Sequence, residues 1–241
     1  MNKCLYLFLS FLSLSLYSCS SDKTLNPSGT VTVKFDHAID VKPLIRDTTI
    51  YINAVGEKYS VSKLEYFISN IRFYRNGVKL ASYDSTFYVN AKLINSNSIL
   101  IENMPIGNYD SMAYLIGLTP NINVYGNLPQ SSYIEGMKMP DTAGTGYAFM
   151  KMEGNWNVGK VYTKYSILIG NNPFLISGSS KINFNINPGR VNTAVVRMNI
   201  NEWFRNPNQY SFKNDGDTTA NNPALMFKLV ANGNNIMDFI Q

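Results

Sequence analysis

The feature of this sequence that most constrains its fold is a succession of short segments in which apolar and polar residues alternate. Between residues 31 and 37, Val31, Val33, Phe35 and His37 occupy every second position, which is typical of a β-strand with one buried face. His37 is therefore expected to point into the core or toward its rim. Further strands are expected at 68–74, 78–80, 87–89, 98–102, 109–116, 147–153, 161–169, 181–186 and 193–200. This spacing predicts a mostly β fold, an antiparallel β-sandwich or a barrel-like domain.

Turn residues between these segments refine the prediction. Asn76-Gly77 is typical of a type I′ turn and predicts a hairpin between the strands that flank it. Residues 62–67 are expected to form a short helical turn. Residues 119–146 have no clear period and form an unusually long loop for a compact domain. Loops of this kind often carry function.

A helix is expected near the C-terminus, so the fold should contain one or two short helices. Asn222 is a suitable N-cap, and Pro223 suits the first helical position, where no intrahelical partner is needed for its missing N–H. Gly233 is expected to end the helix. Its buried face should carry Met226, Leu229 and Val230. No internal repeat and no second domain is seen in the sequence.

The N-terminus has the pattern of an export signal with a lipid attachment site. Lys3 precedes an apolar stretch over residues 5–16, which matches a secretory signal and is too short for a spanning helix of about 20 residues. Leu16-Tyr17-Ser18-Cys19 resembles a bacterial lipobox, in which the cysteine is acylated after cleavage before it. We therefore expect a signal peptide at 1–18, a lipidated tether at 19–29 and one β domain at 30–241. The alternative is an ordinary secreted protein with an incidental cysteine.

This interpretation sets the compartment and the chemistry of the mature chain. Cys4 leaves with the signal peptide and Cys19 carries lipid, so the folded domain is expected to have neither a free thiol nor a disulfide. Ser20 is not the aspartate that resembles inner-membrane retention signals, so we expect a cell-envelope protein anchored at the outer membrane. The net charge of +5 is scattered without a run of five basic residues, which argues against a nucleic-acid partner.

Few residues offer catalytic chemistry. The chain has a single histidine, so a hydrolytic triad could be built only around His37. Gly144-Thr145-Gly146 lacks the remainder of a phosphate-binding fingerprint and precedes a strand, which favours a tight loop. A structural zinc site wants about four nitrogen or sulfur ligands, and this domain offers one imidazole. We therefore expect a binding protein and not an enzyme.

Four segments of the chain carry specific motifs: Gly56–Ile71, Met104–Asp110, Tyr114–Leu118 and Gly146–Gly154. They include Tyr-Phe-Ile-Ser-Asn-Ile and Phe-Met-Lys-Met-Glu-Gly. Taken together, these segments resemble a known family, the MbnP-like domain, and the resemblance extends roughly over residues 30 to 240. The family comprises periplasmic copper-binding partners of methanobactin systems and is widespread as lipoproteins in Bacteroidetes.

The resemblance implies a copper ion held by histidines and an oxidised tryptophan, with a dihaem peroxidase-like or TonB-type partner. His37, in Val-x-Phe-x-His, matches the early family histidine. Ala148 and Leu168 stand where relatives have further histidines, and residues 137–141 lack the modifiable tryptophan. Trp156 and Trp203 lie elsewhere and are interpreted as packed aromatic residues.

Three hypotheses follow for function. The first is a membrane-anchored binding lipoprotein whose family copper site is degenerate. The second is Cu(I) binding by His37 with Met139, Met150 or Met152, because thioethers are suitable soft ligands; the alternative role of these methionines is core packing. The third is a glycan or peptide binder that uses loop aromatics such as Tyr125 and Tyr133.

Overall fold

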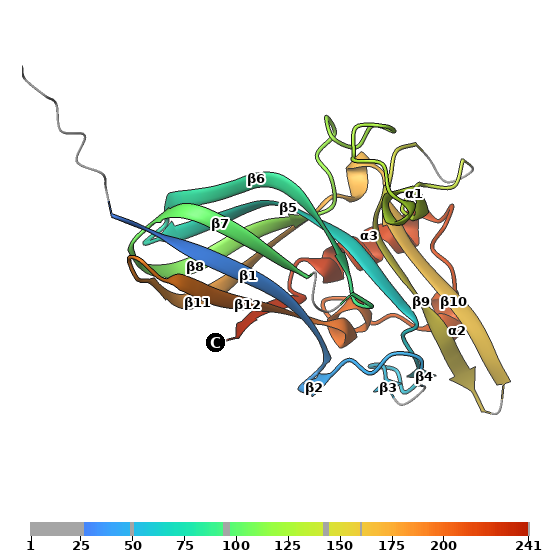
Figure 1. Ribbon diagram of the computed structural model, residues 1–241. Helices are drawn as coiled ribbons and strands as arrows, with labels where there is room; N and C mark the ends of the chain where they lie inside the picture. Colours follow the sequence, from blue (N-terminus) through green and yellow to red (C-terminus); the bar gives the residue numbers. More distant parts are fainter. Residues whose placement is uncertain (1–26, 49–50, 94–96, 142–144, 160, 241) are drawn as a thin grey trace, which may run out of the picture.

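Two curled β-sheets enclose the core (Figure 1). The computed structural model describes residues 27–48, 51–93, 97–141, 145–159 and 161–240, so the predicted signal peptide and Cys19 lie outside the described residues. The first sheet has the order β13-β12-β1-β2, with β7 also paired to β1. The second has the order β11-β8-β5-β9-β4-β3, with β10 paired to β9 and β6 to β5. A mostly β sandwich is therefore confirmed.

The strand bounds are as follows. The first sheet contains β1 (Ser28–Ile39), β2 (Lys42–Pro43), β7 (Ser98–Pro105), β12 (Val191–Asn199) and β13 (Met237–Ile240). The second contains β3 (Tyr51–Ile52), β4 (Lys58–Tyr59), β5 (Lys63–Arg75), β6 (Val78–Asn90), β8 (Gly107–Ile116), β9 (Ala148–Val158), β10 (Val161–Gly170) and β11 (Ile176–Ile186).

The edges of the two sheets approach each other and give the sandwich a barrel-like body. β6 lies beside β7 on one side, and β11 lies beside β13 on the other. The β9–β10 hairpin extends beyond this body, away from the end where β1 begins (Figure 1). The domain thus has a barrel-like end, which the chain enters through Ser28, and a hairpin end.

One strand pair departs from the predicted antiparallel pattern. β1 and β12 run parallel, with Thr30 beside Val191 and His37 beside Met198. The alternation expected along β1 is confirmed, because Val31, Val33 and Phe35 are buried. Strand direction in a sheet depends on which distant segment supplies the neighbour, and the pattern within one strand does not contain that information.

The short helical turn expected over residues 62–67 is wrong, because this stretch begins the long strand β5. One edge of β5 pairs with β6 along most of its length. The other edge of β5 pairs with β9 from Lys63 to Tyr66 and with β8 from Ile68 to Tyr74. Consecutive residues such as Tyr66, Phe67 and Ile68 are buried because both faces of β5 are covered. A strand buried on both faces loses its alternation and cannot be told from a helical segment by period alone.

Two glycine positions explain local geometry. The Asn76-Gly77 turn between β5 and β6 has φ of 49° and 76° at its two residues, as a type I′ hairpin requires, so that prediction is confirmed. Gly117, just after β8, has φ of 125°, and a Cβ there would lie 2.7 Å from the ring of Phe149. A side chain at this position would therefore push β9 away from β8.

The predicted C-terminal helix is α3 (Pro223–Gly233). The N–H of Leu225 donates to Oδ1 of Asn222 at 3.2 Å, and Leu229 is fully buried. Gly233 is the last residue of α3, but its backbone is not left-handed; a Cβ there would lie 3.0 Å from Trp203. Close packing against Trp203 is therefore the physical reason for this glycine.

The remaining helical turns are short. The long predicted loop contains α1 (Ser132–Gly136), which is capped by Ser131. The others are α2 (Phe212–Asp215) and the 3-10 turns η2 (Asn172–Phe174) and η3 (Ile200–Phe204). Among the described residues, no helix has the length and apolar character needed to span a membrane.

Methionines form a conspicuous part of the core. Every methionine in the described part of the chain is buried, from Met104 on β7 to Met237 on β13. Their flexible side chains fill irregular gaps between aromatic rings. The described residues include no cysteine, so packing of this kind stabilises that part of the chain.

Candidate functional site

The candidate site is centred on His37, which joins the two sheets across the core. His37 lies on β1 and is only 7% exposed. Its Nε2 lies 3.1 Å from Oη of Tyr66 on β5, and the two rings meet edge to face at 78° with centroids 5.7 Å apart. The alternation of β1 correctly predicted that His37 points inward, but nothing in the sequence identified Tyr66 as its partner.

Burial determines the charge of both groups. Desolvation lowers the pKa of His37 to about 4, although the carboxylate of Asp36 acts in the opposite direction. Asp36 is itself held by Arg197, whose Nη2 lies 2.8 Å from its Oδ2. Burial raises the pKa of Tyr66 well above its usual range. At neutral pH the site therefore consists of a neutral imidazole and a neutral phenol that share one hydrogen bond.

Two methionines lie beside this pair. Met198 is the in-register neighbour of His37 on β12, and Met150 is the in-register neighbour of Tyr66 on β9. Side chains of such partners stand on the same face of a sheet. Met152 lies two residue pairs farther along, opposite Leu64. Met198 was not among the predicted ligands, because its position beside His37 depends on the parallel pairing of β1 and β12.

Met139 occupies a different position. Its Sδ contacts the backbone at Gly170, near the end of β10, so closely that a Cβ at Gly170 would overlap it. Gly170 pairs with Ala148 at the start of β9. Met139 therefore packs at the end of the hairpin where β9 begins and β10 ends. The methionines beside the His37–Tyr66 pair are Met150 and Met198.

The positions that align with further family histidines lie on the β9–β10 hairpin and do not both face His37. Ala148 pairs with Gly170, where the register of the hairpin shifts, whereas Leu168 on β10 pairs with Lys151. Because successive residues of a strand point to opposite faces, Leu168 stands on the face of the hairpin opposite to Met150, which lies beside the His37–Tyr66 pair. Both backbone groups of Leu168 are bound by Oγ1 of Thr219, at 2.7 and 2.6 Å.

The donor set does not fit the histidine-rich copper site that the family resemblance implies. Within the described ranges, no three residues of the types His, Cys, Asp and Glu are grouped so as to hold a metal. His37 is the only histidine of the chain. The two tryptophans are packed: Trp156 stacks on Phe212 with centroids 5.7 Å apart, and Trp203 is fully buried.

The loop tyrosines considered for ligand binding are half exposed and firmly packed. Tyr125 is 52% exposed; its ring stacks on Tyr147 at 6.1 Å, and Nζ of Lys138 lies 3.7 Å from its centroid. Tyr133 is 48% exposed and stacks on Tyr88 at 6.1 Å. Their ring faces are therefore partly used within the protein.

A carboxylate that the sequence did not single out binds the N-terminal end of α2. Glu57 accepts hydrogen bonds from Nδ2 of Asn53, Oγ of Ser211 and the N–H of Phe212, each at 2.8 Å, and from the N–H of Lys213 at 3.0 Å. Burial raises the pKa of Glu57, but these hydrogen bonds outweigh it and lower the pKa below its ordinary value.

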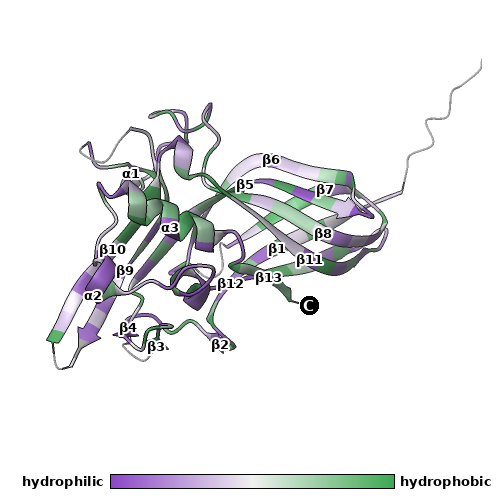
Figure 2. Ribbon diagram, turned by 180° about the vertical axis from the view of Figure 1, so that it is seen from behind, coloured by the Kyte–Doolittle hydropathy of each residue, from purple (hydrophilic) through white to green (hydrophobic). Residues whose placement is uncertain are grey.

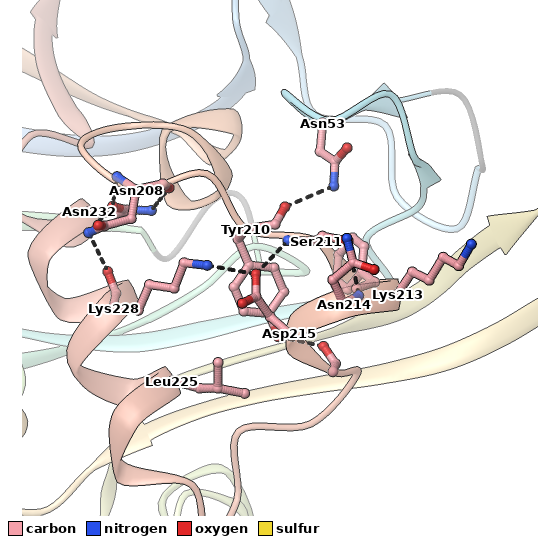
Figure 3. A network of polar contacts seen from close by, with 12 residues as sticks. Asn53, Asn208, Tyr210, Ser211, Lys213, Asn214, Asp215, Leu225, Lys228 and Asn232 are labelled. Carbon is pink, nitrogen blue, oxygen red and sulfur yellow. Dashed lines mark hydrogen bonds and ion pairs between the residues drawn. The ribbon is translucent and has the colours of Figure 1, made fainter.

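The same region continues into a polar network that attaches α3 (Figure 3). Lys228 on α3 pairs with Asp215 on α2 at 2.7 Å. Asn232 is fully buried; its Nδ2 donates to the carbonyls of Trp203 and Asn208 at 2.8 and 2.7 Å. These bonds join residues far apart in sequence, so only the three-dimensional structure reveals them.

Together, the fold and site define a two-sheet β domain with a buried histidine–tyrosine pair beside methionines. A family model described as MbnP matches residues 28–227. The chain therefore belongs to the MbnP family, as the sequence resemblance predicted.

One solved structure extends the comparison. The chain is similar to MbnP from Methylosinus trichosporium, with 14% identity over 82% of this chain and 87% of that chain, at a TM-score of 0.51. At this identity the likeness concerns the fold. A search of curated proteins gives no match.

Proposed function

We propose that this chain is a membrane-anchored, extracytoplasmic binding lipoprotein of the MbnP family whose copper site is degenerate. The observation that carries the proposal is the hydrogen bond between Nε2 of His37 and Oη of Tyr66. The lipid anchor is inferred from Cys19, and no catalytic step is proposed.

The hydrogen bond supports this proposal for a geometric reason. A metal needs the lone pair of an imidazole nitrogen, and Nε2 is either protonated as the donor to Tyr66 or engaged as its acceptor, so His37 offers at most Nδ1 and the chain has no second imidazole. Binding a metal at Nε2 would leave the buried hydroxyl of Tyr66 unpartnered, at a cost of about 1–3 kcal/mol. Protonation is not the obstacle, because the low pKa of His37 keeps its ring neutral.

The second candidate function is Cu(I) binding by His37 and thioethers. It is favoured by the in-register positions of Met198 beside His37 and of Met150 beside Tyr66. Sulfur and imidazole ligands suit Cu(I). A metal at Nε2 would require Tyr66 to give up its hydrogen bond, and Met139 and Met152 are less favourably placed to contribute.

A Cu(I) competition titration against a chromogenic chelator distinguishes the two candidates. The samples are the full-length protein, His37→Ala, and the double variant Met150→Leu with Met198→Leu; Met104→Leu on β7 is the matched control for removing a buried thioether. We expect the wild type to leave the copper with the chelator. One copper held per chain in wild type and Met104→Leu, but lost in the other two variants, would overturn the degenerate-site proposal.

A gain-of-function variant tests the assignment from the other direction. Ala148→His combined with Leu168→His restores two family residue types, but Leu168 stands on the face of the hairpin opposite to Met150, away from the His37–Tyr66 pair. We expect no copper retention in the same titration. Tight copper binding by this variant would show that the start of β9 and the end of β10 rearrange around a metal.

A further inference from the structure

We propose that the outer face of the β9–β10 hairpin binds a neutral oligosaccharide. A groove of about 410 Å³ lies on this face, between β9, β10 and the segment that precedes α3. We call it the hairpin groove. Its polar lining includes Ser62, Glu153, Asn155, Lys164, Ser166 and Asp217.

Strand register places these polar side chains in rows. Glu153 pairs with Ser166, and Asn155 pairs with Lys164, so all four stand on the face of β9 and β10 opposite to Met150 and Met152. In Figure 2 the outer part of this hairpin is coloured mainly as hydrophilic. The hairpin groove is therefore separate from the His37 site, and this inference goes beyond the proposed function.

The far wall of the groove is fixed by backbone pairing. The N–H of Ser166 donates to the carbonyl of Asp217 at 2.8 Å, and Ser166 forms a parallel bridge with Thr218. Thr219 then holds both backbone groups of Leu168. The segment thus continues the sheet beyond β10 and holds the Asp217 backbone in place beside the groove.

The charges of the groove favour a neutral ligand. Glu153 is paired with Nζ of Lys63 at 3.5 Å. Lys164 and Asp217 both line the groove, and neither forms an ion pair or a side-chain hydrogen bond with another residue that the structure describes. A cation or an anion would satisfy one of them and be repelled by the other. Sugar hydroxyls both accept and donate, so they can pair with Lys164 and Asp217 together.

An exposed aromatic ring extends this polar face. Tyr162 is 64% exposed and makes no ring contact with another described residue. It lies two positions before Lys164 on β10, so its side chain stands on the same face, beside Asn157. A tyrosine ring supplies a rigid, amphipathic contact surface, which suits the apolar C–H face of a pyranose. The polar side chains of the hairpin groove, next to the single exposed ring of Tyr162, suit a sugar better than an apolar peptide side chain.

The test is a glycan array that displays neutral and charged oligosaccharides, probed with the full-length protein. The variants are Tyr162→Ala and Asp217→Asn, and the matched control is Tyr133→Ala, which removes an exposed tyrosine from the loop that contains α1. We expect retention of neutral oligosaccharides by wild type and control, with a loss of affinity of about tenfold or more in both groove variants.

Several results would overturn the proposal. The wild type could retain no neutral oligosaccharide, or it could retain only charged glycans. The wild type and both groove variants could also retain neutral oligosaccharides equally. Equal loss in Tyr133→Ala would assign binding to the loop tyrosines instead. Thermal melts of all variants show whether a loss reflects unfolding. The copper titration has no bearing on these outcomes, so the two proposals fail separately.

Discussion

Acid sensitivity of the fold provides a direct test of the His37–Tyr66 pair. The pKa of His37 is lowered from 6.5 to about 4 in the folded protein. Between these values the unfolded chain binds a proton at His37 that the folded protein excludes, so stability is highest above pH 6.5 and falls as the pH decreases toward 4. At about 1.4 kcal/mol for each pH unit, the full loss amounts to roughly 3 kcal/mol.

The assay uses the fact that the chain has one histidine. Its Cε1–H resonance gives a single NMR titration curve without assignment, and we expect a midpoint near the value of about 4. Urea unfolding at pH 7 and pH 5 gives the linked free energy. Between pH 7 and pH 5 we expect the free energy of unfolding of the wild type to fall by about 2 kcal/mol more than that of His37→Gln. The two proteins have the same carboxylates, and the glutamine side chain does not titrate, so the difference reports on His37 alone.

Two results would refute this reasoning. A midpoint near 6.5 would show that the imidazole is hydrated in the folded protein. An equal loss of stability in wild type and His37→Gln would show that carboxylates alone cause the acid sensitivity. In either case the occupied Nε2 could no longer be used to argue against a metal at His37.

Three further predictions concern the carboxylate anchor, α3 and the lipid. Glu57→Gln should lower the free energy of unfolding by about 2 kcal/mol at pH 7, because an amide cannot accept all four hydrogen bonds. Glu102→Gln, at an exposed glutamate, is the control. Because the pKa of Glu57 is lowered in the folded protein, the difference in stability between wild type and Glu57→Gln should shrink as the pH falls below 4.5. Leu229→Asp should destabilise by about 3 kcal/mol or more, whereas Pro223→Ala should cost less than about 1 kcal/mol; equal thermal midpoints would mean that α3 is not docked. Cys19→Ser should fold normally but leave the detergent phase on fractionation, because attachment depends on the acyl chains; retention there would contradict the lipobox.

Local signals in the sequence were sufficient for most of the fold. The alternation along β1, the Asn76-Gly77 turn and the Asn222-Pro223 helix start depend on residues close in sequence, and the structure confirms all three. The prediction for residues 62–67 failed because both faces of β5 are covered in the folded domain, so consecutive residues such as Tyr66 and Phe67 are buried. The burial of this stretch is a property of the assembled sheet.

The candidate site was less accessible to prediction. His37 could be placed in the interior, but Tyr66 is one of sixteen tyrosines, and no local pattern sets it apart. Met198 is placed beside His37 by the parallel pairing of β1 and β12. A sequence signal for the proximity of His37 and Met198 would have to connect residues about 160 positions apart.

The parallel pairing of β1 with β12 also bears on how the chain reaches its native state. The chain is synthesised from its N-terminus, so β1 is available early, whereas β12 at 191–199 follows much later. Until then β1 has its partners on β2 and β7 but lacks its long parallel neighbour. Contacts of such high sequence separation slow folding and leave an unpaired strand edge exposed. During that interval the chain depends on protection by chaperones more than a domain built from consecutive hairpins would.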